Sequence, residues 1–392
     1  MRSVNGSTAA AAVVYGGKTA FAWLAMRKLN WHHLLLVSFL IVFVFVYWQM
    51  AGDGALEEIG AVFFGKTSTS CPKKPYVANV SLSDLVSTFR YKHPHDSRIV
   101  AKNEFRLGER AMKTAIQLID DLVLEYNRRP IEMECVSRLP TLVLVTAVSS
   151  NHFNELLEHI TPGDKIRPHK KIVVYDLGLN PQEIDQLTKM SYVDYRKFKF
   201  SRFPEHVKNL RTYAFKPLII AETLAQFGAV MWMDSSVILK QHSKYAHLLE
   251  WMIKRKSAFL YYVSPSRHSI VFATHERMLD YLPMRGAKES NAKMQQATGM
   301  ILFNTEHVLK HVMKWVVFCS LLEDCITPKG SQLECNFNLP DDVFGGCHRY
   351  DQSLFAVLVS NAYKDEMRRY CLSRDSAGMY PAIVQRAEEK SV

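Results

Sequence analysis

The stretch Val-Met-Trp-Met-Asp-Ser-Ser-Val at residues 230–237 decides how this chain folds. Its first four residues are apolar and read as a short buried strand, and Asp234 follows at the carboxyl end. In α/β proteins, ligands bind in the crevice outside the carboxyl ends of the strands. We therefore expect Asp234 to face a ligand. The alternative is a carboxylate that only caps a helix or a turn.

Strand-like and helix-like segments alternate from residue 140 onward. Apolar runs of the buried-strand type occupy residues 141–146, 171–175, 192–200 and 230–233. Helical patterns occupy residues 153–160, 181–190 and 217–227. Such alternation predicts an α/β domain with a mostly parallel sheet flanked by helices. Two later strands, at residues 257–263 and 298–303, are expected as antiparallel additions.

The N-terminal part of the chain predicts a membrane anchor. Residues 34–50 are apolar apart from Ser38 and Gln49, and flanking aromatic residues extend the run to about 20 residues, enough for a transmembrane helix. Basic residues without acids precede the run, so the positive-inside rule keeps residues 1–33 in the cytosol. A cleaved signal peptide is the alternative, but no small-residue cleavage site follows directly. The pattern favours a single-pass type II membrane protein.

Beyond the anchor, the sequence predicts a stem, a helical lead-in and a larger domain. Residues 51–100 are polar and interrupted by Pro and Gly, as in a tether. Residues 101–139 contain an amphipathic helical pattern at 104–129, and residues 140–392 are predicted to form the larger domain, with a cysteine-rich C-terminal part. The Asn-Val-Ser sequon at residues 79–81 then lies on the luminal side, where it can be glycosylated.

Charge and cysteine content narrow the classes of partner and compartment. The formal net charge is +11, but the basic residues are spread along the chain, which argues against nucleic acid and fits anionic lipids or phosphorylated ligands. Seven cysteines suit an oxidising compartment. Four of them lie close together and predict disulfides of undetermined connectivity, with zinc as the alternative: Cys319, Cys325, Cys335 and Cys347.

Several motifs occur in an order that is similar to a known fold. They are the 141–146 strand, a strand ending in Asp176-Leu177-Gly178, the helix start Phe215-Lys216-Pro217, the 230–237 stretch and Cys347-His348-Arg349-Tyr350-Asp351-Gln352. This order resembles the nucleotide-diphospho-sugar transferase (GT-A) fold, and most closely the little-characterised type II membrane proteins of that class. The resemblance covers roughly residues 140–363. Together with the anchor and stem, it implies the layout of a Golgi glycosyltransferase.

The resemblance implies a donor site at Asp234. Many members of this class hold Mn²⁺ or Mg²⁺ on an Asp-x-Asp pair at the end of the central strand, where the metal bridges the diphosphate of a nucleotide sugar. Asp234 matches the first Asp, but Ser236 stands at the position of the second. One expectation is a metal held by Asp234, Ser236 and His348. The other is that Lys216 and Arg211 neutralise the phosphates directly.

Further residues are expected around the sugar and the nucleotide. Asp351 matches a late Asp that acts on the acceptor hydroxyl or the sugar in the resembling class, and Gln352 lies beside it. His348 shares a face with Asp351 if this segment is helical. Ser149 and Asp176 follow the first two strands, where the class contacts the nucleotide, although each also fits an ordinary cap or turn.

The expected function is a luminal glycosyltransferase that moves a sugar from a nucleotide-sugar donor to a glycan or protein acceptor, with Asp351 and Asp234 catalytic. The alternative is a membrane-anchored pseudoenzyme or sugar-binding interaction protein, which the Ser236 departure motivates. An adhesion ectodomain would leave Asp234 unexplained, and a serine hydrolase would need a Gly-x-Ser-x-Gly elbow that is absent here. Three residues are placed on the acceptor side, or alternatively in core and turns: Gln295, Thr298 and Gly299.

Overall fold

The computed structural model describes residues 12–15, 18–21, 79–134, 139–160, 172–239, 245–263, 265–285, 292–340, 343–372 and 382–383. The chain forms two compact units, Met1–Ser70 and Cys71–Val392. In the first unit, β1 (Ala12–Tyr15) and β2 (Lys18–Phe21) pair antiparallel. The expected anchor at residues 34–50 lies outside the described residues. Within those residues, no helix has both the length and the apolar character needed to cross a bilayer.

The second unit is built on a six-stranded sheet with the order β5-β4-β3-β6-β11-β8. Four neighbouring strands run parallel: β3 (Val143–Val148), β4 (Ile172–Asp176), β5 (Val193–Lys197) and β6 (Ala229–Met233). β11 (Gly299–Phe303) is antiparallel to both of its neighbours, β6 and β8 (Phe259–Tyr261). The strand order reverses between β3 and β6. A reversal of this kind opens a ligand crevice at the carboxyl ends of the strands.

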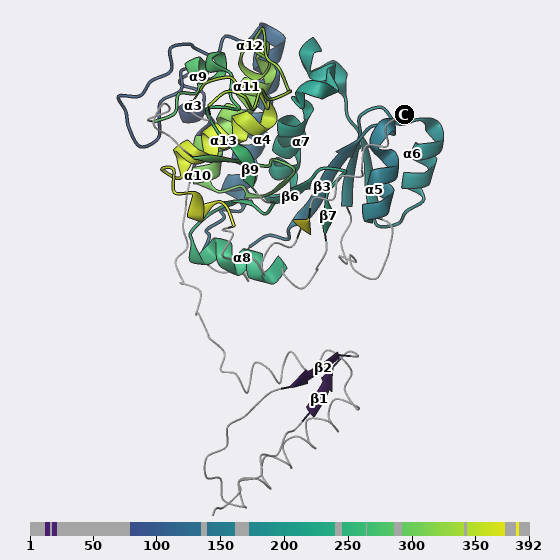
Figure 1. Cartoon of the computed structure of the whole chain (residues 1–392). Coiled ribbons are helices and arrows are strands. Elements are labelled where there is room, and N and C mark those ends of the chain that lie inside the picture. Colours follow the sequence, from purple (N-terminus) through teal and green to yellow (C-terminus); the bar gives the residue numbers. More distant parts are fainter. Residues whose placement is uncertain are drawn as a thin grey trace, which may run out of the picture. The chain divides into compact units, whose positions relative to one another are not determined.

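Helices connect the strands and surround the sheet (Figure 1). The longer ones are α4 (Glu109–Arg128), α5 (Phe153–Ile160), α6 (Pro181–Thr188), α7 (Phe215–Phe227), α8 (Tyr245–Lys254), α11 (Lys314–Leu321) and α13 (Asp351–Ala362). Shorter ones are α3 (Leu82–Leu85), α9 (Glu276–Tyr281), α10 (Glu306–Val308), the π-helix η7 (Leu309–Met313) and α12 (Glu323–Ile326). The 3₁₀ turns are η2 (Ser150–His152), η3 (Phe200–Arg202), η4 (Glu205–Lys208), η5 (Leu210–Thr212) and η8 (Met367–Arg369). Two small antiparallel pairs join β9 (Pro265–Ser269) to β10 (Lys293–Gln295) and β7 (Ile238–Leu239) to β12 (Ala382–Ile383).

Both faces of the sheet are covered by a hydrophobic core. Alternate residues of a strand point to opposite faces, so neighbours in one strand belong to different cores. Val173 and Tyr175 of β4 belong to the main hydrophobic core, whereas Ile172 and Val174 belong to a smaller one. The smaller core contains apolar residues of α5 and α6. The main core contains α7, against which α4 and α11 pack. Figure 1 shows α5 and α6 on one side of β3, and α4 and α7 on the other.

Local sequence fixes the ends of the helices beside the sheet. Asn180 accepts a hydrogen bond from the Glu183 backbone N–H, and the Glu183 carboxylate accepts one from the Asn180 N–H, which forms a capping box at the start of α6. Pro181 suits the first turn, since its missing N–H would have no partner there. α7 ends at Gly228, whose φ of 74° lies in the left-handed region that glycine adopts without strain.

The predicted α/β class and the mostly parallel sheet are confirmed. β11 is antiparallel, as expected for residues 298–303. β3 begins two residues later than expected, because pairing with β6 starts at Val143. β5 ends at Lys197, earlier than expected, since the chain turns into η3 after it.

The expected stem at residues 51–100 requires a correction at its C-terminal end. Val80, Leu85 and Tyr91 are buried in the same core as the sheet. The side chain of Asn127 on α4 also holds the backbone of Val80, with hydrogen bonds of 2.9 Å to its N–H and its carbonyl. These apolar residues are widely spaced in a polar segment, so its average composition resembled that of a tether. Residues 79–100 therefore belong to the folded unit.

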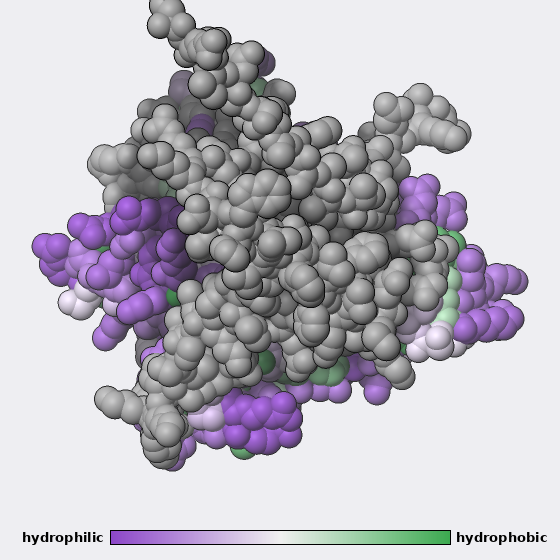
Figure 2. Space-filling view, turned by 90° about the horizontal axis from the view of Figure 1, so that it is seen from below, coloured by the Kyte–Doolittle hydropathy of each residue, from purple (hydrophilic) through white to green (hydrophobic). Residues whose placement is uncertain are grey.

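Two disulfides confirm the expectation for the clustered cysteines and settle their connectivity. They join Cys319 to Cys325 and Cys335 to Cys347. Cys371 is a buried thiol, and the remaining two cysteines lie outside the described residues. At the margins of the face in Figure 2, the described residues are mostly hydrophilic.

Candidate functional site

The carboxylate of Asp234 is fixed at the carboxyl end of β6. Its backbone N–H donates a 2.9 Å hydrogen bond to the Thr298 carbonyl, which continues the pairing between β6 and β11. Its carbonyl accepts a 3.0 Å hydrogen bond from the Val237 N–H, which closes a turn. The indole N–H of Trp232 donates a 2.7 Å hydrogen bond to Asp234 Oδ1. The carboxylate is thus held in one orientation at the reversal of the strand order.

Lys216 brings a buried ammonium group to this carboxylate from the first turn of α7. Its Nζ lies 3.0 Å from Asp234 Oδ1 and 3.3 Å from Oδ2, and 3.4 Å from the Ala297 carbonyl. The rings of Tyr213 and Trp232 lie 5.4 Å and 5.7 Å from Nζ, within the range of cation–π contacts. The ammonium is therefore surrounded by acceptors and aromatic faces.

Asp351 completes a buried ion triad with Lys216 and Asp234. It is the first residue of α13, and its Oδ2 lies 2.8 Å from Lys216 Nζ. The side chains of Lys216 and Asp351 are 4% and 5% exposed, whereas that of Asp234 is 21% exposed. Asp234 is therefore the most exposed member of the triad.

The backbone is strained just before Lys216 and just before Asp351. Tyr213, just before α7, has φ 52°, and Tyr350, just before Asp351, has φ 44°. Residues other than glycine rarely adopt positive φ, and such strain is concentrated at functional sites. Both tyrosines place the following helix so that its first turn points a charged residue into the triad.

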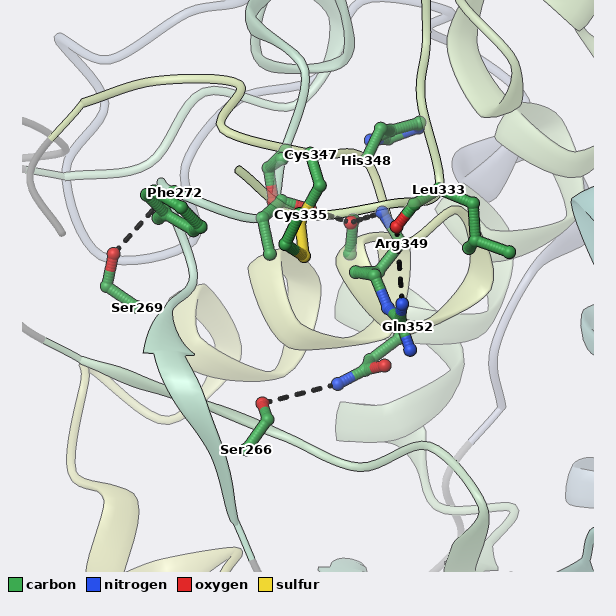
Figure 3. Close-up of a disulfide and its surroundings, with 12 residues drawn as sticks. Ser266, Ser269, Phe272, Leu333, Cys335, Cys347, His348, Arg349 and Gln352 are labelled. Carbon is green, nitrogen blue, oxygen red and sulfur yellow. Dashed lines mark hydrogen bonds between the residues drawn. A yellow bond between two sulfur atoms is a disulfide. The ribbon is translucent and has the colours of Figure 1, made fainter. Parts of the chain in front are cut away.

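The segment before Asp351 is anchored to the rest of the domain. The N–H groups of Cys347 and Arg349 donate hydrogen bonds to the carbonyls of Phe272 and Ala273, at 3.2 Å and 3.1 Å. Figure 3 shows the disulfide of Cys335 and Cys347 beside the start of α13, with Arg349 and Gln352 nearby. The disulfide and this short ladder together fix the position from which Asp351 enters the triad.

The surroundings of the triad shift the pKa values of Lys216 and Asp351 upward. Burial lowers the pKa of Lys216, but the carboxylates of Asp234 and Asp351 outweigh it and raise that pKa above its ordinary value. Burial raises the pKa of Asp351, and the Lys216 ammonium opposes this effect only in part. The lysine is thus charged at every physiological pH, and the Asp351 carboxylate is more basic than an ordinary aspartate.

Arg211 supplies a second positive charge at the rim. It is exposed and lies two residues before Tyr213. Its charge acts on Tyr350, where it opposes the burial that raises the pKa of that phenol. No acid forms an ion pair with Arg211 in the part of the chain that the structure describes.

Two side-chain oxygens near the triad have no hydrogen-bond partner among the described residues. They are Gln295 Oε1 and Thr298 Oγ1, and both are buried. Gln352, which follows Asp351, donates a 2.9 Å hydrogen bond to the Gln295 carbonyl. Buried polar atoms are nearly always paired, so these two oxygens are candidates to accept hydrogen bonds from a ligand or from water.

Other expected nucleotide contacts have structural partners. Asp176 is buried and accepts 2.7 Å hydrogen bonds from the N–H groups of Gly178 and Leu179 and from the Tyr195 hydroxyl, which is ordinary turn chemistry. The Ser149 hydroxyl donates a 2.6 Å hydrogen bond to Asn151 Oδ1 at the end of β3. Neither residue contacts the triad, and their roles toward a nucleotide remain predictions.

His348 differs most from its expected place. Its Nδ1 accepts a 3.1 Å hydrogen bond from the His275 N–H, and its Nε2 bonds the Ile326 carbonyl at 3.1 Å. α13 begins only at Asp351, so the expected shared helical face does not exist. Both ring nitrogens are engaged, and the ring as placed offers no free lone pair to a metal.

The residues present do not fit a divalent cation between the two carboxylates. A Mg²⁺ ion would lie about 2.1 Å from each carboxylate oxygen, in the space that the Lys216 ammonium fills. Ser236 is partly exposed and adds only a neutral oxygen. Among the described residues, the one cluster with metal-ligand geometry is His268, Cys335 and Cys347, and its two sulfurs are bonded to each other.

Sequence reasoning missed the role of Trp232 and left that of Gly299 open. Trp232 was taken only as one of the apolar residues of the strand, yet its indole N–H orients Asp234. Gly299 lies where an added Cβ would come within 2.5 Å of Val263 and 2.7 Å of Tyr262, so it lets β11 approach β8 closely. The Trp-x-Asp spacing in a strand places both side chains on one face, which is the signal that could have identified Trp232.

Comparisons with known proteins give the following similarities. The family model "Protein of unknown function (DUF1647)" matches residues 81–221. No curated protein sequence matches the chain. Among solved structures, the apo bifunctional glycosyltransferase WbbM is similar at 12% identity and a TM-score of 0.30, over 45% of this chain and 34% of that one.

Two other solved structures show comparable similarity. Mouse xyloside xylosyltransferase 1, in its apo form, matches at 8% identity and a TM-score of 0.33, over 59% of this chain and 84% of that one. The mannosyltransferase PcManGT from Pyrobaculum calidifontis, in complex with GDP-Man and Mn²⁺, matches at 12% identity and a TM-score of 0.25, over 51% and 56%. The chain thus spans less than two thirds of WbbM and of PcManGT.

Proposed function

We propose that the second unit is a glycosyltransferase domain that binds a nucleotide sugar at the crevice around Asp234. The observation that carries the proposal is the ion triad of Lys216, Asp234 and Asp351 at the reversal of the strand order. Ligands of α/β proteins bind at this reversal. A fixed carboxylate beside buried unpaired acceptors suits the hydroxyl groups of a sugar, since each hydroxyl can donate a hydrogen bond.

The roles of the residues follow from their exposure and charge. Asp234, with its exposed edge, accepts hydrogen bonds from donor hydroxyls. Arg211 at the rim attracts the diphosphate. In the transfer, the acceptor oxygen bonds to the anomeric carbon, the bond from that carbon to the diphosphate breaks, and the electron pair leaves with the diphosphate. The acceptor proton passes to Asp351, whose raised pKa makes it a stronger base.

The domain is proposed to act in the lumen of the Golgi as part of a type II membrane protein. The apolar run at residues 34–50, the basic residues before it and the two disulfides support this topology. The predicted acceptor is a glycan or a glycoprotein. Expression of the full-length chain with a protease-protection assay tests the topology, and exposure of residues 79–392 to cytosolic protease would contradict it.

The enzyme proposal is tested by turnover of the full-length chain in detergent against a panel of nucleotide sugars. Asp234→Asn should lower turnover of the accepted donor by about 10² to 10³, the usual loss when one key polar contact to the transition state is removed. Asp194→Asn serves as a control, because Asp194 pairs with Arg196 at the far edge of the sheet. Equal turnover in Asp234→Asn and wild type would refute the site.

A second candidate is a sugar-binding protein or pseudoenzyme without transfer activity. The neutral Ser236 and the lysine between the two carboxylates favour it, since both depart from a metal-assisted site. It predicts donor binding by calorimetry without release of nucleoside diphosphate. Any Asp234-dependent release of the diphosphate would exclude this candidate.

A further inference from the structure

We propose that Lys216 is the resident cation of the donor site, so that its ammonium group takes the position of a divalent metal ion. This inference rests on the proposed function and specifies how its site handles charge. The first support is position. Nζ lies 3.0 Å from Asp234 and 2.8 Å from Asp351, between carboxylates that come from strand β6 and helix α13.

The second support is the completeness of the ammonium's surroundings. An ammonium group has three N–H donors. Asp234, Asp351 and the Ala297 carbonyl supply three acceptor groups within 3.4 Å of Nζ. The nitrogen is therefore held on several sides by oxygen atoms, as a metal ion would be, and has no freedom to swing aside for a second cation.

The third support is the sum of charges. Two carboxylates and one divalent cation would sum to zero. Asp234 and Asp351 with Lys216 alone leave one negative charge, and Arg211 at the rim brings the sum to zero again. Arg211 is the cation that is left to meet the diphosphate, because Lys216 is buried and already paired with both carboxylates. Lys216 is accordingly a positioning residue, which holds Asp234 in place for the donor.

The fourth support is the local sequence at the end of β6. Ser236 offers a neutral hydroxyl where a second acidic ligand would otherwise strengthen a metal site. His348, the remaining expected ligand, uses both ring nitrogens in hydrogen bonds within the protein. Within the described residues, the carboxylates that converge on this point are thus already matched by lysine.

The test measures Mn²⁺ binding to the full-length protein by electron paramagnetic resonance, without any sugar donor. Wild type should bind no Mn²⁺ through Asp234, so Asp234→Asn should leave the signal unchanged. Lys216→Ala frees both carboxylates and opens space between them, and it should gain one Mn²⁺ site that disappears in the double variant Lys216→Ala/Asp234→Asn. Lys314→Ala, which removes a buried lysine without acidic partners among the described residues, should gain none.

The outcomes separate this inference from the proposed function. A wild-type Mn²⁺ site that Asp234→Asn abolishes would overturn the inference and leave the glycosyltransferase proposal standing. A folded Lys216→Ala protein without a new site would also overturn it. If Lys216→Ala does not fold, wild-type turnover decides: full activity in excess chelator supports the inference, and a loss of at least tenfold that Mn²⁺ restores contradicts it. Absence of turnover with every donor would count against the proposed function alone.

Discussion

Among the described residues, two lysines are buried in very different surroundings. Lys216 on α7 and Lys314 on α11 are each 3% exposed. Lys216 lies between Asp234 and Asp351. Lys314 donates a 3.1 Å hydrogen bond to the Thr88 carbonyl and lies 4.1 Å from the ring centre of Trp315, with no acid as a partner among the described residues.

The two environments move the pKa values of the lysines in opposite directions. Burial lowers the pKa of Lys314 to about 8, because a neutral amine is easier to bury than an ammonium. Burial acts on Lys216 in the same sense, but its two carboxylates overcome it and raise the pKa. Partners rather than depth thus decide whether a buried amine keeps its charge. We infer a site at Lys216 and a packing role for Lys314.

The strongest test of this contrast is Lys216→Met. It leaves Asp351 buried without its counter-charge, and breaking a buried ion pair by removing one partner typically costs about 3–5 kcal/mol. Urea unfolding of the disulfide-intact protein measures the loss. A change below about 1 kcal/mol would mean that the triad is loosely packed and that Lys216 resembles Lys314 after all.

A second test loosens the segment that carries Asp351. The double variant Cys335→Ser/Cys347→Ser opens a loop of 12 residues and should lower the free energy of unfolding by about 3 kcal/mol. Donor turnover should fall as well, because Asp351 loses its fixed approach. Cys319→Ser/Cys325→Ser is the matched control, since it opens the other disulfide, in α11 and α12. Equal losses of turnover in the two variants would show that the Cys335–Cys347 bond has no special effect on the triad.

A pair of histidines extends the contrast to pH dependence. Burial, with smaller effects of neighbouring charges, lowers the pKa of His307 and of His311 to about 4. In the unfolded chain both titrate near 6.5, so the unfolded state binds more protons as the pH falls from about 6.5 to 4. Stability should therefore decrease over this range and level off below it. Their partial burial limits the effect to roughly 2 kcal/mol in total.

Thermal unfolding at pH 7 and pH 4.5 measures this effect. His307→Gln/His311→Gln should reduce the difference between the two pH values. The matched control is His152→Gln, because His152 lies on the surface beside Glu155. If the double variant keeps the full pH dependence of wild type, other groups are responsible for it.

The smallest expected effect is a gain in stability when Lys314 is replaced. Lys314→Met keeps a long side chain in the core and removes an ammonium that is costly to bury, at the loss of one hydrogen bond to Thr88. We expect stabilisation of about 1 kcal/mol at pH 7 and none at pH 10, where wild-type Lys314 is already neutral. Chemical denaturation at the two pH values measures both. Destabilisation at pH 7 would show that the contact with Trp315 outweighs the cost of burial.

The sequence predicted the strands that position the site better than the contacts between its side chains. The apolar run before Asp234 identified β6 and its carboxyl end, and the order of strands predicted a parallel sheet. Lys216 and Asp351 were each singled out, but a salt bridge between residues 135 positions apart depends on how α7 and α13 pack. No local pattern encodes that distance.

Two expectations from the sequence failed for a related reason. His348 was expected to share a face with Asp351 if their segment were helical, but Tyr350 has a positive φ and α13 starts only at Asp351, so the condition is not met. Residues 79–100 were expected as a tether, because composition reports average polarity and not the few buried contacts of Val80, Leu85 and Tyr91. Both errors arise where tertiary contacts override short-range patterns.

The order in which the triad's members occur along the chain has a consequence during synthesis. Lys216 and Asp234 leave the ribosome more than a hundred residues before Asp351. At 5–20 residues per second, the lysine waits roughly 5–20 s with only one of its two carboxylates. During the first part of that interval the sheet cannot close fully either, because β11 (residues 299–303) lies between β6 and β8 and is synthesised after both. The nascent domain therefore passes through a partly assembled stage in which its charged centre is open to water, and it becomes competent only when α13 docks.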